Sequence, residues 1–265
     1  MSAGDERVSG VHVAAAVGFQ ANADAYERGR PGFPPEVTDA LVRACGIDAG
    51  SRVVDLAAGT GKLTRALLPS GAAMIAVEPV EGMRRVFAEQ LPGVPVIAGT
   101  AEAMPLESGS SDAVVASQAF HWFDPVAAPR EIHRVLTTGG ALGLVWHVRD
   151  ESVPWVAELT NLMEPYRGDT PSYRTGNWRR GLDATDQFTP LERMQFRYDQ
   201  PMTVDGLLDR VLSVSFMAAL PADGRRTVEE RVRRLAATDP ALAGRDTFAL
   251  PYRTDVYVCR ALQSA

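Results

Sequence analysis

One short stretch of the sequence combines a strand, an acid and small residues in the pattern of a ligand-binding turn. Val53 and Val54 predict a buried strand, which Asp55 ends, and Gly59 and Gly61 follow within the next six positions. Small residues let the backbone pass close to a ligand, and a helix that begins after them offers its free N–H groups and its positive end. We therefore expect a ligand to bind where this strand turns into the next helix.

A second acid strengthens this interpretation. Glu78 ends the next predicted strand, 17 positions after Gly61. In parallel α/β sheets a carboxylate at that place accepts hydrogen bonds from both hydroxyls of a ribose. The turn and Glu78 together predict a ligand that contains a ribose.

Two common ribose-containing ligands fit the turn poorly. A dinucleotide fingerprint would place Gly or Ala at position 64, which holds Thr64. A phosphate-binding Walker A loop would need Ser or Thr after Gly61-Lys62, but Leu63 follows, and its leading glycine position holds Leu56.

Two histidines are placed to act on a bound molecule. His121 follows the fourth predicted strand and His147 ends the fifth, and ligands of open α/β sheets bind at the carboxyl ends of strands. Histidine is the usual general base in proteins, so both are candidate catalytic residues. The alternative for His121 is a hydrogen bond to the backbone that orders its loop, and the alternative for His147 is a hydrogen-bond donor that only supports residues which contact the ligand. Neither histidine has a carboxylate at metal-ligand spacing, so we predict no metal.

Aromatic residues and arginines near these histidines predict a substrate site. Arginine suits carboxylate recognition, so the loop from Tyr173 to Arg180 favours an acidic substrate, unless its arginines only pair with surface acids. The candidate substrate-binding residues are Phe120, Trp122, Trp146, Tyr173, Arg174 and Trp178.

The elements that position these residues alternate between strand and helix. Predicted strands at 51–56, 73–78, 95–98, 113–117 and 141–148 are separated by helices at 63–68, 82–90 and 125–136, after a first helix at 35–44. This alternation, with short connections and a turn at Gly139-Gly140, predicts a doubly wound parallel sheet. Later, helices at 153–165, 203–217 and 221–238 and strands at 192–200 and 247–262 predict a helical cap inserted before the last strand.

The composition excludes several classes of protein. The chain has 265 residues, a net charge of −6 and Lys62 as its only lysine, so it lacks the basic surface with which proteins bind nucleic acids. No apolar run approaches the ~20 residues that span a bilayer. Asp5 and Glu6 precede the apolar segment 11–19, where a secretory signal would carry positive charge, so we expect a cytoplasmic protein.

The turn and two later segments resemble a known family. Asp55 to Gly61 resembles the first motif of class I S-adenosylmethionine-dependent methyltransferases, with Ala57 in place of the usual glycine. The segment from Gly99 to Leu106 is similar to that of the methyltransferase type 11 group. Gln118 to Phe123, with Phe19, Tyr26, Arg30 and Pro31, resembles the trans-aconitate methyltransferase-like branch.

The resemblance implies a seven-stranded, mostly parallel, Rossmann-like sheet and roles for particular residues. Asp55, Ala57, Gly59 and Gly61 would line the methionine end of S-adenosylmethionine, and Glu78 would hold its ribose. Met83 and Ala101 would flank the adenine, Thr100 replaces an aspartate that meets the adenine amino group, and Tyr26 and Arg30 would close over the methionine carboxylate. Glu102 and Ser117 complete the implied cofactor site.

We therefore expect a methyltransferase that uses S-adenosylmethionine, releases S-adenosylhomocysteine and acts on a small molecule, as a monomer or homodimer. Its parts would be an N-terminal arm or lid (1–34), a cofactor-binding core (35–150) and a cap with the last two strands (151–265). The alternatives are a cofactor-binding member that does not methylate, and a methyltransferase of RNA or protein. Neither nucleic acid nor membrane is an expected partner.

Overall fold

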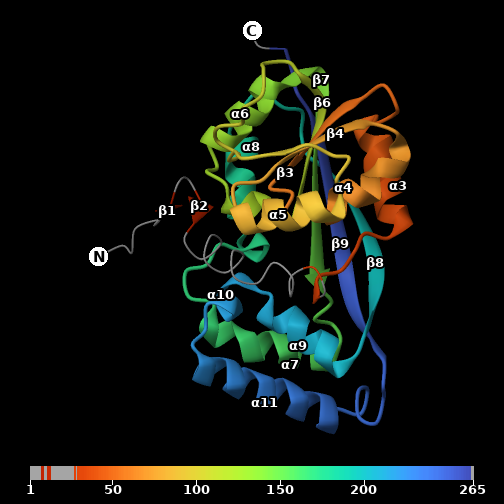
Figure 1. Ribbon diagram of the computed structural model, residues 1–265, viewed down its shortest axis with the longest axis vertical. Coiled ribbons are helices and arrows are strands. Elements are labelled where there is room, and N and C mark those ends of the chain that lie inside the picture. Colours follow the sequence, from red (N-terminus) through yellow and green to blue (C-terminus); the bar gives the residue numbers. More distant parts are fainter. Residues whose placement is uncertain (1–6, 9–10, 13–26, 28, 264–265) are drawn as a thin grey trace.

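The computed structural model describes residues 7–8, 11–12, 27 and 29–263, and the expected arm therefore lies mostly outside the described residues. Most of the described chain forms one seven-stranded sheet flanked by helices (Figure 1). Its strands are β3 (Arg52–Leu56), β4 (Ala73–Val77), β5 (Val96–Ile97), β6 (Ser111–Ser117), β7 (Leu136–Arg149), β8 (Glu192–Met202) and β9 (Phe248–Arg260). Two short strands, β1 (Arg7–Val8) and β2 (Val11–His12), pair separately.

The strand order β5-β4-β3-β6-β7-β9-β8 confirms the doubly wound prediction. Strands β3 to β7 pair in parallel, whereas β9 pairs antiparallel with both β7 and β8. The order reverses at β3, between β4 and β6, and in such sheets the switch point is where ligands bind. Asp55, the last but one residue of β3, and Ser117, the last residue of β6, therefore lie on neighbouring strands at the predicted ligand site.

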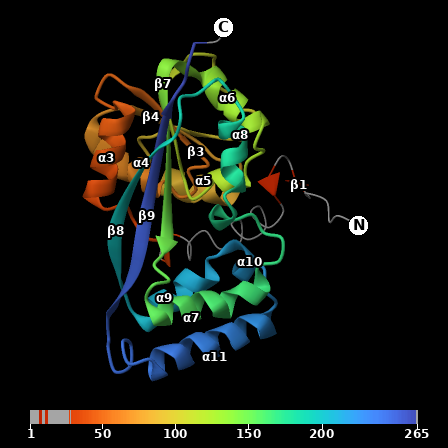
Figure 2. The ribbon, with the colours of Figure 1, turned by 180° about the vertical axis from the view of Figure 1, so that it is seen from behind.

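Helices cover both faces of the sheet because successive side chains of a strand point to opposite faces. On β3, Val53 packs with α3 (Pro35–Cys45) and α4 (Lys62–Leu67), whereas Val54 packs with α6 (Ala127–Val135). Helix α5 (Glu81–Gln90) packs through Phe87 against β4. Figure 2 shows α8 (Arg180–Asp183) on the side opposite α4 and α5.

The cap is a second layer at the end of the sheet toward which β7 points (Figure 1). It consists of α7 (Pro154–Met163), α9 (Val204–Leu212), α10 (Ser215–Ala218) and α11 (Ala222–Thr238). These helices share an apolar cluster of their own, which includes Leu159, Val211 and Val232 and continues to Tyr252 of β9. As the sequence predicted, helices are inserted between β8 and β9, although there are three of them where two were expected.

Two local predictions were wrong. The expected turn at Gly139-Gly140 lies inside β7, where the pairing with β6 jumps from Ser111↔Leu136 to Ala113↔Ala141 and Gly139 takes a φ of 78°. The irregularity is thus a bulge in a continuous strand, a position where glycine is common. The single helix expected at 203–217 is split, because Val214 is extended between α9 and α10. Among the described residues, no helix is long and apolar enough to cross a membrane.

Candidate functional site

The predicted cofactor turn joins β3 to α4 with left-handed backbone at three positions. Ala57, Gly59 and Gly61 have φ values of 54°, 59° and 87°. A side chain on Gly61 would come within 2.9 Å of the Phe87 ring, so this position has no room for a Cβ. Ala57 has a Cβ atom although its backbone lies in the left-handed region, which disfavours one. This backbone conformation explains why glycine is usual at this position of the motif.

Glu78 fixes the shape of the turn. Its buried carboxylate accepts hydrogen bonds from the backbone N–H of Gly59 at 2.9 Å and of Val80 at 2.8 Å. Burial raises the pKa of Glu78 to about 7, although both hydrogen bonds favour the charged form. Each carboxylate oxygen keeps a further lone pair that can accept a hydrogen bond from a hydroxyl group.

Asp55 is fully buried beneath the same turn. The Thr64 hydroxyl donates to its Oδ2 at 2.5 Å, and its Oδ1 has no hydrogen-bond partner among the described residues. Burial raises the pKa of Asp55 to about 7. Buried carboxylate oxygens are normally satisfied, so the unpartnered Oδ1 is a candidate contact for a ligand.

The other predicted cofactor residues lie around this turn or at nearby strand ends. Met83 and Ala101 are buried, Thr100 bridges to Ala103, and Ser117 ends β6. Glu102 accepts a hydrogen bond from the backbone N–H of Asp124 at 2.8 Å. Tyr26 and Phe19 lie outside the described residues.

Glu27 is a contact of the turn that no sequence motif indicated. Its carboxylate accepts a hydrogen bond from the Thr60 hydroxyl at 2.5 Å and pairs with Arg65 at 3.2 Å and with Lys62 at 3.3 Å. The Lys62 ammonium also donates to the Glu27 carbonyl at 2.7 Å. Three residues later, Arg30 donates to the carbonyl of Ser213 in the cap at 3.1 Å, so this part of the arm spans from the turn to the cap.

His121 lies in a short 3-10 helix, Phe120–Trp122, and lines two neighbouring cavities. Its Nδ1 accepts a hydrogen bond from the indole N–H of Trp146 at 3.3 Å. Burial, with the positive charges of Arg30 and Arg167, lowers the pKa of His121 to about 3. The ring is therefore neutral at physiological pH.

His147 lies on the opposite face of β7 from Trp146 and is buried among aromatic rings. Its Nδ1 bonds the Thr254 hydroxyl at 2.7 Å, and the Phe33 ring lies 4.9 Å away. Burial and the nearby Arg210 lower its pKa to about 3, although a backbone hydrogen bond with Gly32 favours the charged form. It lines the smaller cavity together with His121.

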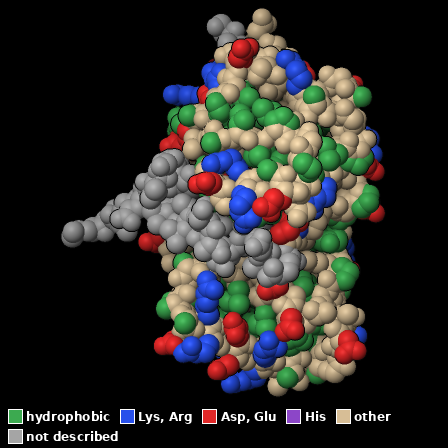
Figure 3. Space-filling view, in the orientation of Figure 1, with side chains coloured by type: hydrophobic (Ala, Val, Ile, Leu, Met, Phe, Trp, Pro, Cys, Tyr) green, Lys and Arg blue, Asp and Glu red, His purple; other side chains and the backbone are tan. Residues whose placement is uncertain are grey.

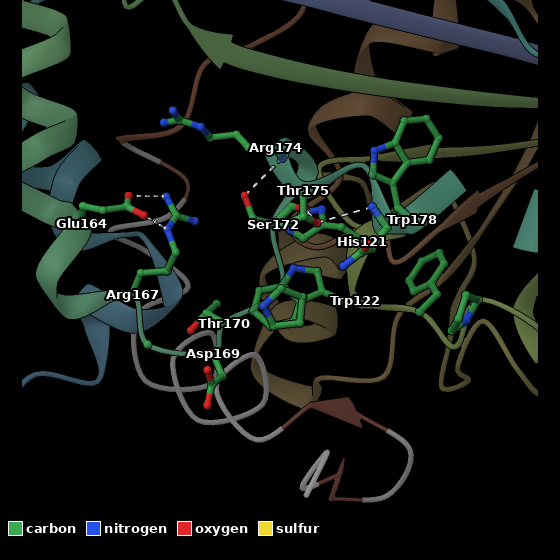
Figure 4. Close-up of a pocket in the computed structure, with 15 residues that line it drawn as sticks. His121, Trp122, Glu164, Arg167, Asp169, Thr170, Ser172, Arg174, Thr175 and Trp178 are labelled. Atoms are coloured by element: carbon green, nitrogen blue, oxygen red, sulfur yellow. Dashed lines mark hydrogen bonds and ion pairs between the residues drawn. The ribbon is translucent and has the colours of Figure 1, made fainter. Parts of the chain in front are cut away.

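The first of these cavities, about 590 Å³ in volume, is shown in Figure 4. His121 and Trp122 face it from the loop after β6, and Glu164 and Arg167 from the opposite side, where they form an ion pair at 2.9 Å. The second cavity, about 150 Å³, lies between the ends of β6 and β7 and helices α9 and α10. We call this second cavity the arginine cavity.

The arginine cavity is strongly cationic. Within the described part of the chain, five arginines and one acid line it: Arg30, Arg149, Arg167, Arg174, Arg210 and Glu151. Glu151 pairs with Arg174 at 2.6 Å and Glu164 with Arg167, whereas Arg149 and Arg210 have no carboxylate within ion-pair distance among the described residues. Burial and the nearby Arg210 lower the pKa of Arg149 to about 10, so it remains a cation.

Arg210 is 6% exposed, which is unusual for an unpaired charge. Its Nε donates to the Tyr252 hydroxyl at 2.9 Å, and its Nη1 has no hydrogen-bond partner among the described residues. Leu207, Leu208 and Val211, its neighbours on α9, are all buried. An arginine on the apolar face of an amphipathic helix is the sequence signal that could have identified this residue, which was not among the predicted site residues.

Three predicted substrate residues belong largely to the core. Phe120, Trp146 and Trp178 are 2%, 1% and 5% exposed and pack together, with the two indole rings 4.5 Å apart. Trp146 and Trp178 still contribute to cavity walls, whereas Phe120 lines none of the described cavities. Trp122 lines both cavities beside His121.

Tyr173 and Arg174 occupy the loop between the cavities. The Tyr173 hydroxyl donates to the buried Asp255 at 2.7 Å, which fixes its ring, and burial together with this hydrogen bond raises the pKa of Tyr173. Gln118, which was not among the predicted site residues, follows β6 with a φ of 56° and donates to the carbonyl of His147 at 3.3 Å. Left-handed backbone at a non-glycine residue often marks a functional site.

Comparisons with known proteins identify the family of the chain. A family model described as a methyltransferase domain matches residues 54–144. The uncharacterized methyltransferase Rv3342 of Mycobacterium tuberculosis is 43% identical over 236 residues, which cover 89% of this chain and 92% of the relative. The methyltransferase-like protein C25B8.10 of Schizosaccharomyces pombe is 35% identical, with the same coverage.

Solved structures share the fold. The YcgJ protein of Bacillus subtilis has a TM-score of 0.55 at 21% identity, over 86% of this chain and 98% of that chain. The cyclase SpnF has a TM-score of 0.54 at 17% identity, over 89% of this chain and 85% of that chain.

The sheet order, the glycine turn and the relatives define a class of enzyme, the class I S-adenosylmethionine-dependent methyltransferases. The chain belongs to this family.

Proposed function

We propose that the chain transfers the methyl group of S-adenosylmethionine to a small molecule that carries a carboxylate, and that this acceptor binds in the arginine cavity. The observation that supports this most is Arg210, a buried guanidinium with an unpartnered Nη1 and no carboxylate beside it among the described residues. The proposal covers transfer to an oxygen, nitrogen or carbon atom of the acceptor.

The residues of the β3–α4 turn fit the cofactor. Glu78 has lone pairs left for two ribose hydroxyls, and Asp55 has a buried oxygen without a partner in the described part of the chain. When bound, the cofactor supplies a methyl group already activated by a cationic sulfur, so the protein contributes mainly position and a dry site.

Arg149 and Arg210 support an acidic acceptor through their energetics. A buried charge without a partner destabilises a protein strongly, and a carboxylate with good hydrogen bonds offsets much of that cost. Arginine also binds a carboxylate through two parallel hydrogen bonds. Two such cations at the end of β7 and on α9 would therefore hold a carboxylate between the sheet and the cap.

The surface supports a small acceptor rather than RNA. Figure 3 shows basic and acidic side chains interspersed on one face of the cap, and pairs such as Arg233–Asp205 join them. The net charge of −6 also disfavours binding to a phosphate backbone.

The test uses Arg210→Met, with Arg231→Met on the exposed face of α11 as the control. The protein is incubated with methyl-labelled cofactor and pairs of carboxylic acids and their amides, and S-adenosylhomocysteine is measured. We expect turnover of acids only. Arg210→Met should raise the acceptor KM by about tenfold to a hundredfold, since charge-assisted hydrogen bonds contribute roughly 1.5–3 kcal/mol.

A second measurement separates this role from a structural one. Removing an uncompensated buried charge should leave the ligand-free protein as stable as before or more stable, so we expect an unchanged or higher Tm for Arg210→Met. A large fall in Tm would make Arg210 a structural residue. Equal turnover of acids and amides would contradict the acidic acceptor, and cofactor binding without any S-adenosylhomocysteine would favour a member that does not methylate.

A further inference from the structure

The hydrogen bond between Trp146 and His121 determines which nitrogen of the histidine carries its proton. An indole N–H can only donate, so the Nδ1 that accepts it carries no hydrogen. A neutral imidazole has one N–H, which must then be on Nε2. The ring lines both cavities, and its Nε2 has no hydrogen-bond partner among the described residues, so the Nε2–H is free to bind a ligand.

The indole is held too firmly to turn away. Trp146 is 1% exposed, and the rings of Trp178, Tyr173 and Tyr257 lie 4.5, 4.9 and 5.9 Å from it. Tyr173 and Tyr257 share a hydrogen bond at 2.8 Å, and Tyr173 also donates to Asp255. The donor that meets His121 is therefore fixed by the whole aromatic cluster.

The charged groups around His121 act against a second proton. Arg30 and Arg167 come from the segment before α3 and from the segment after α7, and both lower its pKa. Arg149, Arg174 and Arg210 line the same cavity, with Glu151 as the acid among the described lining residues. In a protonated His121, the Nδ1–H would also face the indole N–H of Trp146, so that two hydrogen-bond donors would repel each other.

We infer that Trp146 is a positioning residue that keeps His121 as a hydrogen-bond donor, with Nε2–H directed to an oxygen of the acceptor, and that His121 does not serve as the general base. Only the part of this inference that concerns the acceptor rests on the proposed function. The position of the proton on the ring follows from the hydrogen bond with Trp146. The ligand group that meets Nε2–H must carry a lone pair, as a carboxylate or carbonyl oxygen does.

The first experiment measures the proton directly, without any acceptor. Long-range 1H–15N spectra of the labelled protein report which ring nitrogen of each histidine is protonated, and His121→Gln assigns the signals. We expect the Nε2–H form of His121 with no titration between about pH 5 and 9, although a free histidine titrates near about pH 6.5. An Nδ1–H form, or titration within that range, would overturn the inference.

Trp146→Phe removes the N–H and keeps an aromatic ring. The Nδ1 is then free, so we expect a mixture of both protonated forms and a pKa closer to the ordinary value. Trp178→Phe is the matched control, because its indole packs on Trp146 but makes no hydrogen bond with His121. Identical spectra of Trp146→Phe and the wild type would also overturn the inference. If Trp146→Phe does not fold, the wild-type spectra still decide.

The second experiment follows methyl transfer once an acceptor has been found. The side-chain amide of His121→Gln can still donate a hydrogen bond but cannot accept a proton, whereas His121→Phe does neither. For a donor we expect His121→Gln to retain kcat to within about tenfold, while His121→Phe loses more. Loss of a general base would lower kcat by about 10²–10⁴ in both variants, which would overturn the inference. Failure of the proposed function would leave the spectroscopic result intact.

Discussion

The carboxylate of Glu78 and the backbone N–H of Gly59 are joined by a hydrogen bond of 2.9 Å that connects β4 to the turn after β3. The same carboxylate holds the N–H of Val80 at the start of α5. Glu78 thus shapes the cofactor turn before any ligand arrives. A ribose held by Glu78 would meet oxygens that are already oriented by the backbone.

This double role sets the expected effect of Glu78→Gln. One oxygen of the carboxylate becomes an NH₂ group that cannot accept from Gly59 or Val80, so the turn loosens and a ribose contact is lost. We expect the affinity for S-adenosylhomocysteine to fall by about tenfold or more, since each charge-assisted hydrogen bond contributes roughly 1.5–3 kcal/mol. Calorimetric titration measures this, with the exposed Glu81→Gln as the control. Unchanged affinity would remove Glu78 from the cofactor site.

Ala57 offers a test of backbone strain. Its φ of 54° favours glycine, so Ala57→Gly should leave the free energy of unfolding unchanged or raise it by up to about 1 kcal/mol. Ala58, the next residue, is not in the left-handed region, and Ala58→Gly should lower stability by about 0.5–1 kcal/mol. Urea denaturation of both variants measures the difference. Equal destabilisation by the two changes would show that the conformation of Ala57 is unstrained.

Asp55 should make stability depend on pH. Its pKa of about 7 in the folded protein lies above the ordinary value near about 4, so between these values the folded state holds a proton that the unfolded chain has released. This carboxyl therefore lowers the free energy of unfolding as the pH rises from about 4 to 7. Asp55→Asn should remove this effect, so the stability of the variant relative to the wild type should increase across that range.

The two neutral histidines have the opposite effect. Because their pKa values are lowered in the folded protein, the unfolded chain binds protons first as the pH falls. Their contribution to the free energy of unfolding therefore increases as the pH rises from about 3 to 6.5. They are present in both proteins and cancel in the difference. Asp246→Asn, which removes an exposed carboxylate, is the control. A stability difference between Asp55→Asn and the wild type that stays constant from about pH 4 to 7 would contradict the raised pKa of Asp55.

Lys62 reports on the contact with Glu27 because it is the only lysine in the chain. Glu27 shields its ammonium and favours its charged form, so Glu27→Ala should increase acylation of Lys62 severalfold. Mass spectrometry of the peptides separates this label from the one on the terminal amine. Glu36→Ala, in the exposed first turn of α3, is the control. Equal labelling of all three proteins would show that Glu27 does not rest on the turn in solution.

The sheet could be predicted from the sequence because each of its signals is local. Alternating apolar runs, Gly59, Gly61 and the acids at strand ends specify elements whose order fixes a parallel sheet. Arg210 could not be predicted as a neighbour of His121 because α9 and the loop after β6 reach the same cavity through tertiary packing that no sequence period records. Trp146 was selected for its place beside His147, yet it contacts His121, because adjacent residues of a strand point to opposite faces.

The chain leaves the sheet at the end of β8 and returns at the start of β9, and between them it builds α9, α10 and α11. The whole of β8 pairs directly with β9, from Glu192↔Val258 to Met202↔Phe248, so the excursion begins and ends at one pair of facing residues. Within this fold the helices that carry Arg210 are therefore a single insertion on a hairpin, while the glycine turn lies on separate strands. Under the proposed function, mutations in this insertion would change one wall of the acceptor site without changing the residues of the β3–α4 turn.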